Sequence, residues 1–312
     1  MSVWSCVRTC GRAAAFVRAA TIMAVFFVAA PGRALDKQGS AHGGSVAGAT
    51  SGFGVEGALM GGLALWNPTF AARPDNSGLA FARYAVHADV DLVGRRLSIP
   101  LDVNVVTDRT REGGRKLLPS ELDFISGVTS TWAVGATAIE IGSRFQHERP
   151  VDRGTFTQTF VDARARWLLS LAEAVPSVSS SLGGGDLSGW LTLGWFAINR
   201  TYVARPDNTG LALFRYAANA RLSFWERRLA IGLDATMFTD RQTSPFRPSE
   251  LDLTPEIVVR LEPFEVHLAY ERDMPLDRGG LVQQFVYLLA AWEFSLFEGR
   301  EAVEDRENIV TP

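Results

Sequence analysis

The sequence predicts an all-β protein: a transmembrane antiparallel β-barrel of about twelve strands, built from two six-strand repeats. The first observation behind this prediction is an internal repeat. Residues 72–85 return as residues 204–217, and the offset of 132 holds without a gap up to Asp108 in the first copy and Asp240 in the second. Such a repeat divides the chain into equivalent structural units. The second observation is that long segments of both copies alternate between apolar and polar residues, which is the period of a β-strand.

The segment 97–106 illustrates this alternation. Leu97, Ile99, Leu101, Val103 and Val105 occupy one parity, and the other parity is mostly polar. A helix would scatter these residues around its axis, whereas a strand places them on one face. The segment 229–238 repeats the pattern. We therefore expect the extended segments of the first repeat at residues 54–67, 78–93, 96–109, 121–133, 137–149 and 159–172.

The lengths of these segments and of their connections favour a membrane barrel over a soluble sandwich. Strands of soluble domains peak near ~5–6 residues, whereas tilted membrane-spanning strands need ~9–11. Tight turns are expected at 93–95, 225–227 and 262–263, and longer loops at 67–77, 110–120 and 149–158. Short turns at one end and long loops at the other are typical of outer-membrane barrels, with the short turns in the periplasm.

Aromatic residues give a second indication of a membrane boundary. Barrels carry aromatic girdles where the wall meets the interface. Five tryptophans fall at or near the expected periplasmic ends of the strands: Trp132, Trp167, Trp190, Trp225 and Trp292. The alternative is that they are ordinary core side chains, but a sandwich core does not require them at one end.

On these features the chain resembles a Gram-negative outer-membrane β-barrel of the porin-like kind over residues 54–297, without resembling a specific family. The resemblance implies an outer-membrane location with lipid as a partner. Barrels of this class often end on an aromatic residue at the chain terminus, whereas here Trp292, Phe294 and Phe297 are followed by a charged tail, residues 298–312.

The remaining segments are predicted from composition. Residues 1–34 have the layout of a secretory signal, with Arg8, Arg12 and Arg18 before the apolar stretch 19–30, and we expect cleavage after Ala34. Residues 35–53 are expected to be flexible. The barrel repeats cover 54–172 and 189–297, and residues 173–188, rich in Ser and Gly, form a periplasmic joint.

Composition also excludes several classes of protein. Both cysteines, Cys6 and Cys10, lie in the predicted signal, so the mature chain has no disulfide and no cysteine metal site. Removing the four arginines of the signal leaves 27 basic and 34 acidic side chains, a net charge of −7. This balance argues against nucleic acid as a partner. We expect no cofactor and no metal ion.

The polar parity of the strands carries many ionisable groups, which predicts a polar lumen. A charge facing hydrocarbon costs ~2–4 kcal/mol at the midplane, so these groups must face inward. Glu140, Arg166, Glu256 and Glu265 belong to this set. The residues expected to line the lumen and orient a ligand are Arg83, His87, Asp89, Asp102, Arg144, Arg164, Arg215, Arg221 and Asp234.

The second repeat has Asn219 and Arg221 in place of His87 and Asp89, so the two repeats contribute different charges to the lumen. Two interpretations are open. An acidic wall and a basic wall would orient dipolar solutes in a pore. Alternatively, Asp89 and Arg221 would pair across the lumen and close it.

Three loop motifs recur in both repeats, at the expected outer ends of the strands: PDN, TDR with PSELD, and PxDRG. Their residues are Asp75, Asn76, Asp108, Arg109, Glu121, Asp123, Asp152 and Arg153 in the first copy, and Asp207, Asn208, Asp240, Arg241, Glu250, Asp252, Asp277 and Arg278 in the second. Pro, Asp, Asn and Gly are turn formers, so PDN and PxDRG can be structural. The carboxylates of TDR and PSELD need either arginine partners or a cation such as Ca²⁺, and arginine pairing is favoured because the spacing matches no calcium loop.

The function expected from these features is a porin-like channel for passive movement of small polar solutes. The alternatives are a closed barrel that presents its outer loops as a binding or structural surface and, behind it, an outer-membrane hydrolase. For the hydrolase the sequence offers only a grouping around His147 and Glu148, with no nucleophile motif. We therefore expect a protein that is not an enzyme.

Overall fold

The computed structural model describes residues 53–68, 77–92, 96–135, 137–152, 157–170, 180–200, 209–242, 246–277 and 282–296. The predicted signal, nearly all of the predicted flexible segment and the charged tail lie outside the described residues, as do both PDN motifs, Arg153 and Arg278. The predictions made for them therefore stay predictions.

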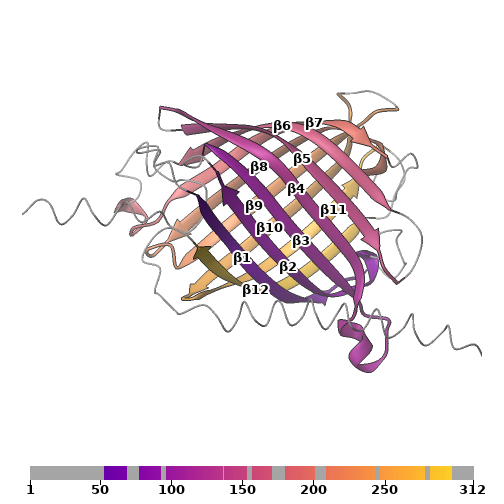
Figure 1. Cartoon of the computed structure of the whole chain (residues 1–312). Helices are drawn as coiled ribbons and strands as arrows, with labels where there is room; N and C mark the ends of the chain where they lie inside the picture. Colours follow the sequence, from indigo (N-terminus) through magenta and orange to yellow (C-terminus); the bar gives the residue numbers. More distant parts are fainter. Residues whose placement is uncertain are drawn as a thin grey trace, which may run out of the picture. The chain divides into compact units, whose positions relative to one another are not determined.

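Twelve strands form one closed antiparallel barrel in which each strand pairs with its neighbours in the chain (Figure 1). The first repeat supplies β1 (Gly54–Trp66), β2 (Ala80–Asp91), β3 (Leu97–Asp108), β4 (Pro119–Val134), β5 (Thr137–Pro150) and β6 (Gln158–Ser170). The second supplies β7 (Leu187–Asn199), β8 (Ala212–Phe224), β9 (Leu229–Asp240), β10 (Pro248–Leu261), β11 (Phe264–Pro275) and β12 (Gln283–Leu296).

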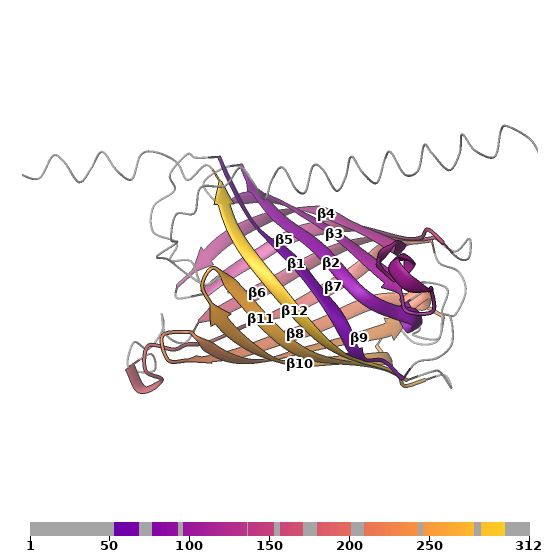
Figure 2. The ribbon, with the colours of Figure 1, turned by 90° about the horizontal axis from the view of Figure 1, so that it is seen from below.

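The barrel closes where the first strand pairs with the last. Val55 lies opposite Leu296 and Ala64 opposite Tyr287 in the β1–β12 ladder, and Figure 2 shows these two strands side by side, indigo beside yellow. Closure removes the unpaired edges that an open sheet would expose, which is a requirement inside a lipid bilayer. The predicted all-β barrel of about twelve strands is confirmed.

Strand alternation separates an apolar outer face from a polar inner face. The outward parity carries large apolar side chains around the barrel, such as Leu63, Ile141 and Leu233, which are 44%, 58% and 45% exposed. Asp102 and Asp162 lie on the opposite parity and take part in contacts inside the barrel. Strands of 12 to 16 residues, longer than those of soluble domains, can cross the hydrocarbon core at a tilt.

The two ends of the barrel differ as predicted. At the short-turn end, β8 and β9 are joined through Trp225, Glu226 and Arg227, all at positive φ, and β10 and β11 through residues 262–263. At the long-loop end, the loops contain the short helices η1 (Ser77–Leu79), η2 (Gly113–Leu117) and η3 (Thr209–Leu211). The rule for outer-membrane barrels assigns the short-turn end to the periplasm.

Two details of the sequence-based boundaries change. Strand β7 begins at Leu187 and β6 ends at Ser170, within two residues of the predicted repeat limits. The second half of the predicted flexible joint is held in place: Ser170 Oγ donates to Asp186 Oδ2 at 3.0 Å, and the Asp186 amide donates to Ser223 Oγ at 2.8 Å. These bonds tie the joint to the end of β8.

The tryptophan prediction is confirmed in part. Trp132, Trp167 and Trp225 are exposed near the short-turn end. The prediction that Trp190 belongs to the girdle is wrong, because its register places it in the lumen, where Arg166 lies 4.7 Å from its ring centroid. Exposed Trp66 and Trp195 form part of a second aromatic group toward the long-loop end. No helix within the described ranges is long and apolar enough to cross a membrane.

Candidate functional site

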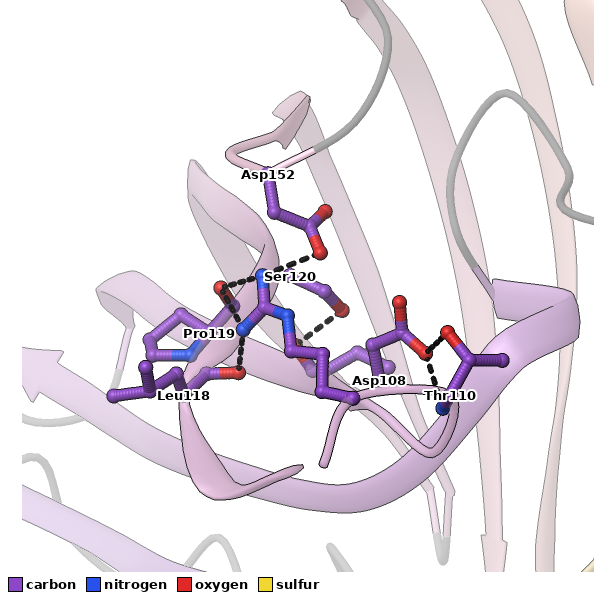
Figure 3. A network of polar contacts seen from close by, with 8 residues as sticks. Asp108, Thr110, Leu118, Pro119, Ser120 and Asp152 are labelled. Carbon is purple, nitrogen blue, oxygen red and sulfur yellow. Dashed lines mark hydrogen bonds and ion pairs between the residues drawn. The ribbon is translucent and has the colours of Figure 1, made fainter. Parts of the chain in front are cut away.

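The repeated TDR motif forms a hydrogen-bonded clamp at the long-loop rim, of which Figure 3 shows the contacts between Asp108 and Thr110. Asp108 Oδ1 accepts hydrogen bonds from the Thr110 amide and hydroxyl, both at 2.7 Å. Arg109 Nη1 donates to the Asn67 carbonyl at 2.6 Å, and Thr107 Oγ1 accepts from the Ala82 amide at 2.9 Å. The motif therefore ties the end of β3 to both β1 and β2.

The second copy makes the same contacts at matching positions. Arg241 Nη1 donates to the Asn199 carbonyl at 3.0 Å, and Thr239 Oγ1 accepts from the Phe214 amide at 3.1 Å. Asp240 Oδ1 accepts from the Gln242 amide at 2.6 Å. Both clamps coincide with a register shift between β2 and β3 or between β8 and β9. The TDR motif thus has a structural role in the described rim.

A second set of contacts joins neighbouring loops at the rim. Arg111 donates to the carbonyls of Leu118 and Pro119, at 2.8 and 3.3 Å, and forms an ion pair with Asp152 (Figure 3). Ser120 Oγ donates to the Val106 carbonyl at 2.9 Å, and its counterpart Ser249 donates to the Phe238 carbonyl at 3.2 Å. Asp152 of the PxDRG motif is therefore one of the residues that hold the loops.

The PSELD carboxylates point into the barrel rather than toward a metal site. Glu121 and Glu250 are buried, with Asp123 and Asp252 two residues further along the same inward parity. No group of three or more His, Cys, Asp or Glu side chains in the described part of the chain is arranged to hold a metal ion. The calcium hypothesis thus receives no support from these residues.

Aromatic side chains pack in two clusters along the inner face of the wall near the long-loop end. Phe160, Phe196 and Phe238 form one cluster, with ring centroids 5.4 and 6.2 Å apart. Phe285 and Tyr287 of β12 form a second cluster at 5.4 Å. All five lie within five residues of the long-loop ends of their strands. We call these five residues the outer packed layer, because all five are buried at that end of the barrel.

The middle of the lumen is charged and more open. His87 lies between two carboxylates: its Nδ1 is 2.6 Å from Asp102 Oδ1, and its Nε2 is 2.9 Å from Asp89 Oδ2. The side chains of His87, Asp89 and Asp102 are 35%, 25% and 30% exposed although they lie on the inner face of the barrel. Solvent-accessible space therefore adjoins these residues.

A similar cluster is found on β10 and β11. His267 Nδ1 lies 3.2 Å from Glu256 Oε2, and His267 Nε2 lies 3.5 Å from Glu265 Oε2. Arg260 also pairs with Glu265, and Arg221 reaches Glu265 from β8 at 3.9 Å. Of the two interpretations left open for Arg221, the pairing with Asp89 is not found, because Arg221 takes its acidic partner from β11.

Arginines gather on the wall formed by β5, β6 and β8. Arg144 pairs with Asp162 at 2.9 Å, and Arg166 pairs with Glu140 at 3.4 Å. Arg164 and Arg215 lie close enough to this group to interact with it electrostatically. Most of the other lumen carboxylates, including Asp234, lie on other strands; Asp234 accepts a hydrogen bond from Asn219 at 2.9 Å. The lumen thus has a basic wall, which draws on both repeats instead of following the predicted division between them.

Sequence reasoning placed the charged residues correctly by parity but missed two features. It overlooked the outer packed layer and gave no role to Gly194. The inward parity of Phe160 and Phe285 was a usable signal for the layer. The pairing of His267 with Glu256 across neighbouring strands depends on register, which one sequence does not display.

The grouping proposed for a hydrolase does not assemble at His147. This residue lies on the outward parity of β5, with its Nδ1 3.0 Å from Thr159 Oγ1, whereas Glu148 lies on the inward parity. Adjacent residues of a strand point to opposite faces, so the two side chains are separated by the barrel wall.

The closed twelve-strand wall, its apolar outer surface and its charged lumen together define a transmembrane β-barrel of the outer-membrane class. No protein-family model matches the chain, and no curated protein matches it.

Three solved structures are similar to the chain at low sequence identity. The KdgM porin in complex with disordered oligogalacturonate is 8% identical, with 77% of this chain and 99% of that chain covered and a TM-score of 0.44. LpxR from Salmonella typhimurium is 8% identical, with 77% and 100% covered and a TM-score of 0.43. An outer membrane channel from Pseudomonas putida is 11% identical, with 83% and 100% covered and a TM-score of 0.41.

Proposed function

We propose that the protein is a porin-like outer-membrane channel for the passive movement of small polar solutes. The observation that carries this proposal is the open, charged middle of the lumen, where His87, Asp89 and Asp102 remain about a quarter to a third exposed inside a closed wall. Partly exposed ionisable side chains in a barrel interior adjoin water, and water is the medium in which polar solutes cross. Opposed acidic and basic walls orient a dipolar solute as it passes.

The outer packed layer favours a second candidate, a closed barrel that presents its loops. Leu211 and Phe285 are each 1% exposed, and Asp108 and Asp240 are fully buried, so the long-loop end is much more tightly packed than the middle. In this alternative the lumen charges serve stability, and the rim clamps hold a binding or structural surface outside the cell.

Single-channel conductance separates these two functions. The folded, purified protein is inserted into a planar bilayer under asymmetric salt, with heat-modifiable migration in gels as the test of folding. Steady open events support the channel, and the reversal potential gives its charge preference. A folded barrel that never conducts contradicts the channel and supports the loop-presenting function.

A further inference from the structure

Two lumen arginines lack the partners that the other basic side chains have. Arg164 makes no hydrogen bond or ion pair with any residue in the described ranges, in contrast to Arg144 and Arg166 beside it. Arg215 contacts the Phe238 ring, 6.0 Å from its centroid, and its Nε is buried with no hydrogen-bond partner among the described residues. A buried donor without an acceptor is unfavourable, so an unmatched guanidinium points to an absent acceptor.

The two arginines flank one glycine in the same register row. Arg164 lies opposite Gly194 across the β6–β7 ladder, and Gly194 lies opposite Arg215 across the β7–β8 ladder. A Cβ built on Gly194 would meet nothing closer than 3.6 Å, the distance to Arg215 Cβ. A notch of about the size of a methyl group, at a buried glycine, therefore lies between the two side chains on the lumen wall.

The other repeat shows the same backbone arrangement without the second arginine. Leu289 of β12, Gly62 of β1 and Arg83 of β2 lie in one such row. In the repeat they are equivalent to Arg164, Gly194 and Arg215, in that order. There, a Cβ on Gly62 would lie 2.2 Å from the Leu288 carbonyl oxygen and 2.5 Å from Leu289 Cδ2, so both backbone and side chain fill the notch. Arg83 donates to Asn104 Oδ1 at 3.4 Å, whereas Thr236 takes the place of Asn104 beside Arg215.

Local charge favours an anion at this place. Asp162 and Glu140 are the carboxylates that act on Arg164 electrostatically, and they pair with Arg144 and Arg166. Positive charge is therefore in excess on this wall, although the chain as a whole is acidic. Guanidinium groups present planar pairs of donors that match the oxygens of carboxylate and phosphate groups.

From this juxtaposition we infer that Arg164, Gly194 and Arg215 form an oxyanion-binding site on the lumen wall, which takes the carboxylate or phosphate group of a small polar solute. The role of this site in transport rests on the proposed channel function. The site adds to that proposal the chemical class of the solute. Arg164 and Arg215 supply the donors, and Gly194 adds no side chain between them.

Direct binding tests the site without requiring conduction. Inorganic phosphate and acetate are titrated separately into the folded protein in detergent micelles at constant ionic strength, with heat release as the readout. Saturable binding of either anion supports the site, and the anion that binds more tightly identifies the preferred group. Absence of saturable binding for both anions overturns it.

Variants connect the binding to these residues. Arg164→Leu copies the residue of the other repeat and is expected to weaken binding by about tenfold or more, because it removes a charge-assisted donor. Arg164→Lys is expected to keep part of the affinity, since it retains the charge but loses the paired donors. Arg215→Gln is a second loss variant in case Arg164→Leu fails to fold.

Arg115→Leu is the matched control, because it removes the same charge from the exposed η2 helix. Equal loss of binding in Arg115→Leu and Arg164→Leu would overturn the site. Binding without conductance would sustain the oxyanion site and overturn the channel, whereas conductance without binding would overturn the site alone. The two proposals therefore fail separately.

Discussion

The two sequence repeats are alike at the long-loop rim and unlike at the middle of the lumen. At the rim, Arg109 and Arg241 bind the carbonyls of Asn67 and Asn199, and the two threonines before them accept matching amide hydrogen bonds. In the lumen, a Cβ at Gly194 beside Arg164 would meet no atom closer than 3.6 Å, whereas a Cβ at Gly62 would lie 2.2 Å from the Leu288 carbonyl oxygen and 2.5 Å from Leu289 Cδ2.

This difference separates two kinds of constraint. Rim side chains bind backbone groups, and backbone amides in a closed wall need partners whatever the lumen carries. Lumen side chains bind one another or face water, so a substitution there changes charge with little demand on the wall. The shared rim contacts are therefore constrained by the stability of the barrel wall, whereas the lumen side chains are constrained by what the lumen can accommodate.

The largest loss of stability is expected when equivalent rings of the outer packed layer are removed from the two repeats. Phe160→Ala and Phe285→Ala remove equivalent buried rings, 4% and 1% exposed, and each is expected to destabilise the barrel by about 3–5 kcal/mol. Urea unfolding in lipid vesicles measures both. A loss below about 1 kcal/mol in either variant would show that its ring is not part of the packed layer.

Removing the two equivalent threonine hydroxyls tests whether the rim contacts stabilise both repeats to the same extent. Thr107→Val and Thr239→Val leave the amides of Ala82 and Phe214 without their acceptors, so each is expected to cost about 1–3 kcal/mol. The same unfolding experiment applies. Strongly unequal losses would contradict a shared structural role for the two motifs.

The two glycines of the lumen wall are expected to respond differently. A Cβ at Gly62 would lie 2.2 Å from the Leu288 carbonyl oxygen, so Gly62→Ala is expected to destabilise by about 1–3 kcal/mol. Gly194→Ala meets no close atom and is expected to change stability by less than about 0.5 kcal/mol. Vesicle unfolding midpoints measure the difference, and equal losses would show that the notch at Gly194 is not open.

The smallest effect on stability is expected for Asp89→Asn. The carboxylate is partly exposed and shares His87 with Asp102, so its loss is expected to cost about 0–1 kcal/mol. In a conducting pore the reversal potential should shift toward anions, because one negative charge leaves the lumen. A large loss of stability in a barrel that shows no conductance would instead favour a closed barrel.

Much of the architecture could be predicted from the sequence. The alternation of Leu97 to Val105 is a local pattern with a period of two, and its length alone distinguishes a membrane strand from a soluble one. The inward placement of Arg164, Asp102 and Asp234 follows from the same parity. The rim role of Asp108 and Arg109 was less accessible, because the Asn67 carbonyl lies 42 residues away in the chain.

By itself, the sequence determined the strand class, the repeat and the polar character of the lumen, because parity and repetition are properties of local order along one chain. Only the tertiary structure decided which charges meet. Arg221 reaches Glu265 from a strand that is not its neighbour, and Arg164, Gly194 and Arg215 align in one row. Closure and register set these contacts, and both arise from pairing between strands across the whole barrel.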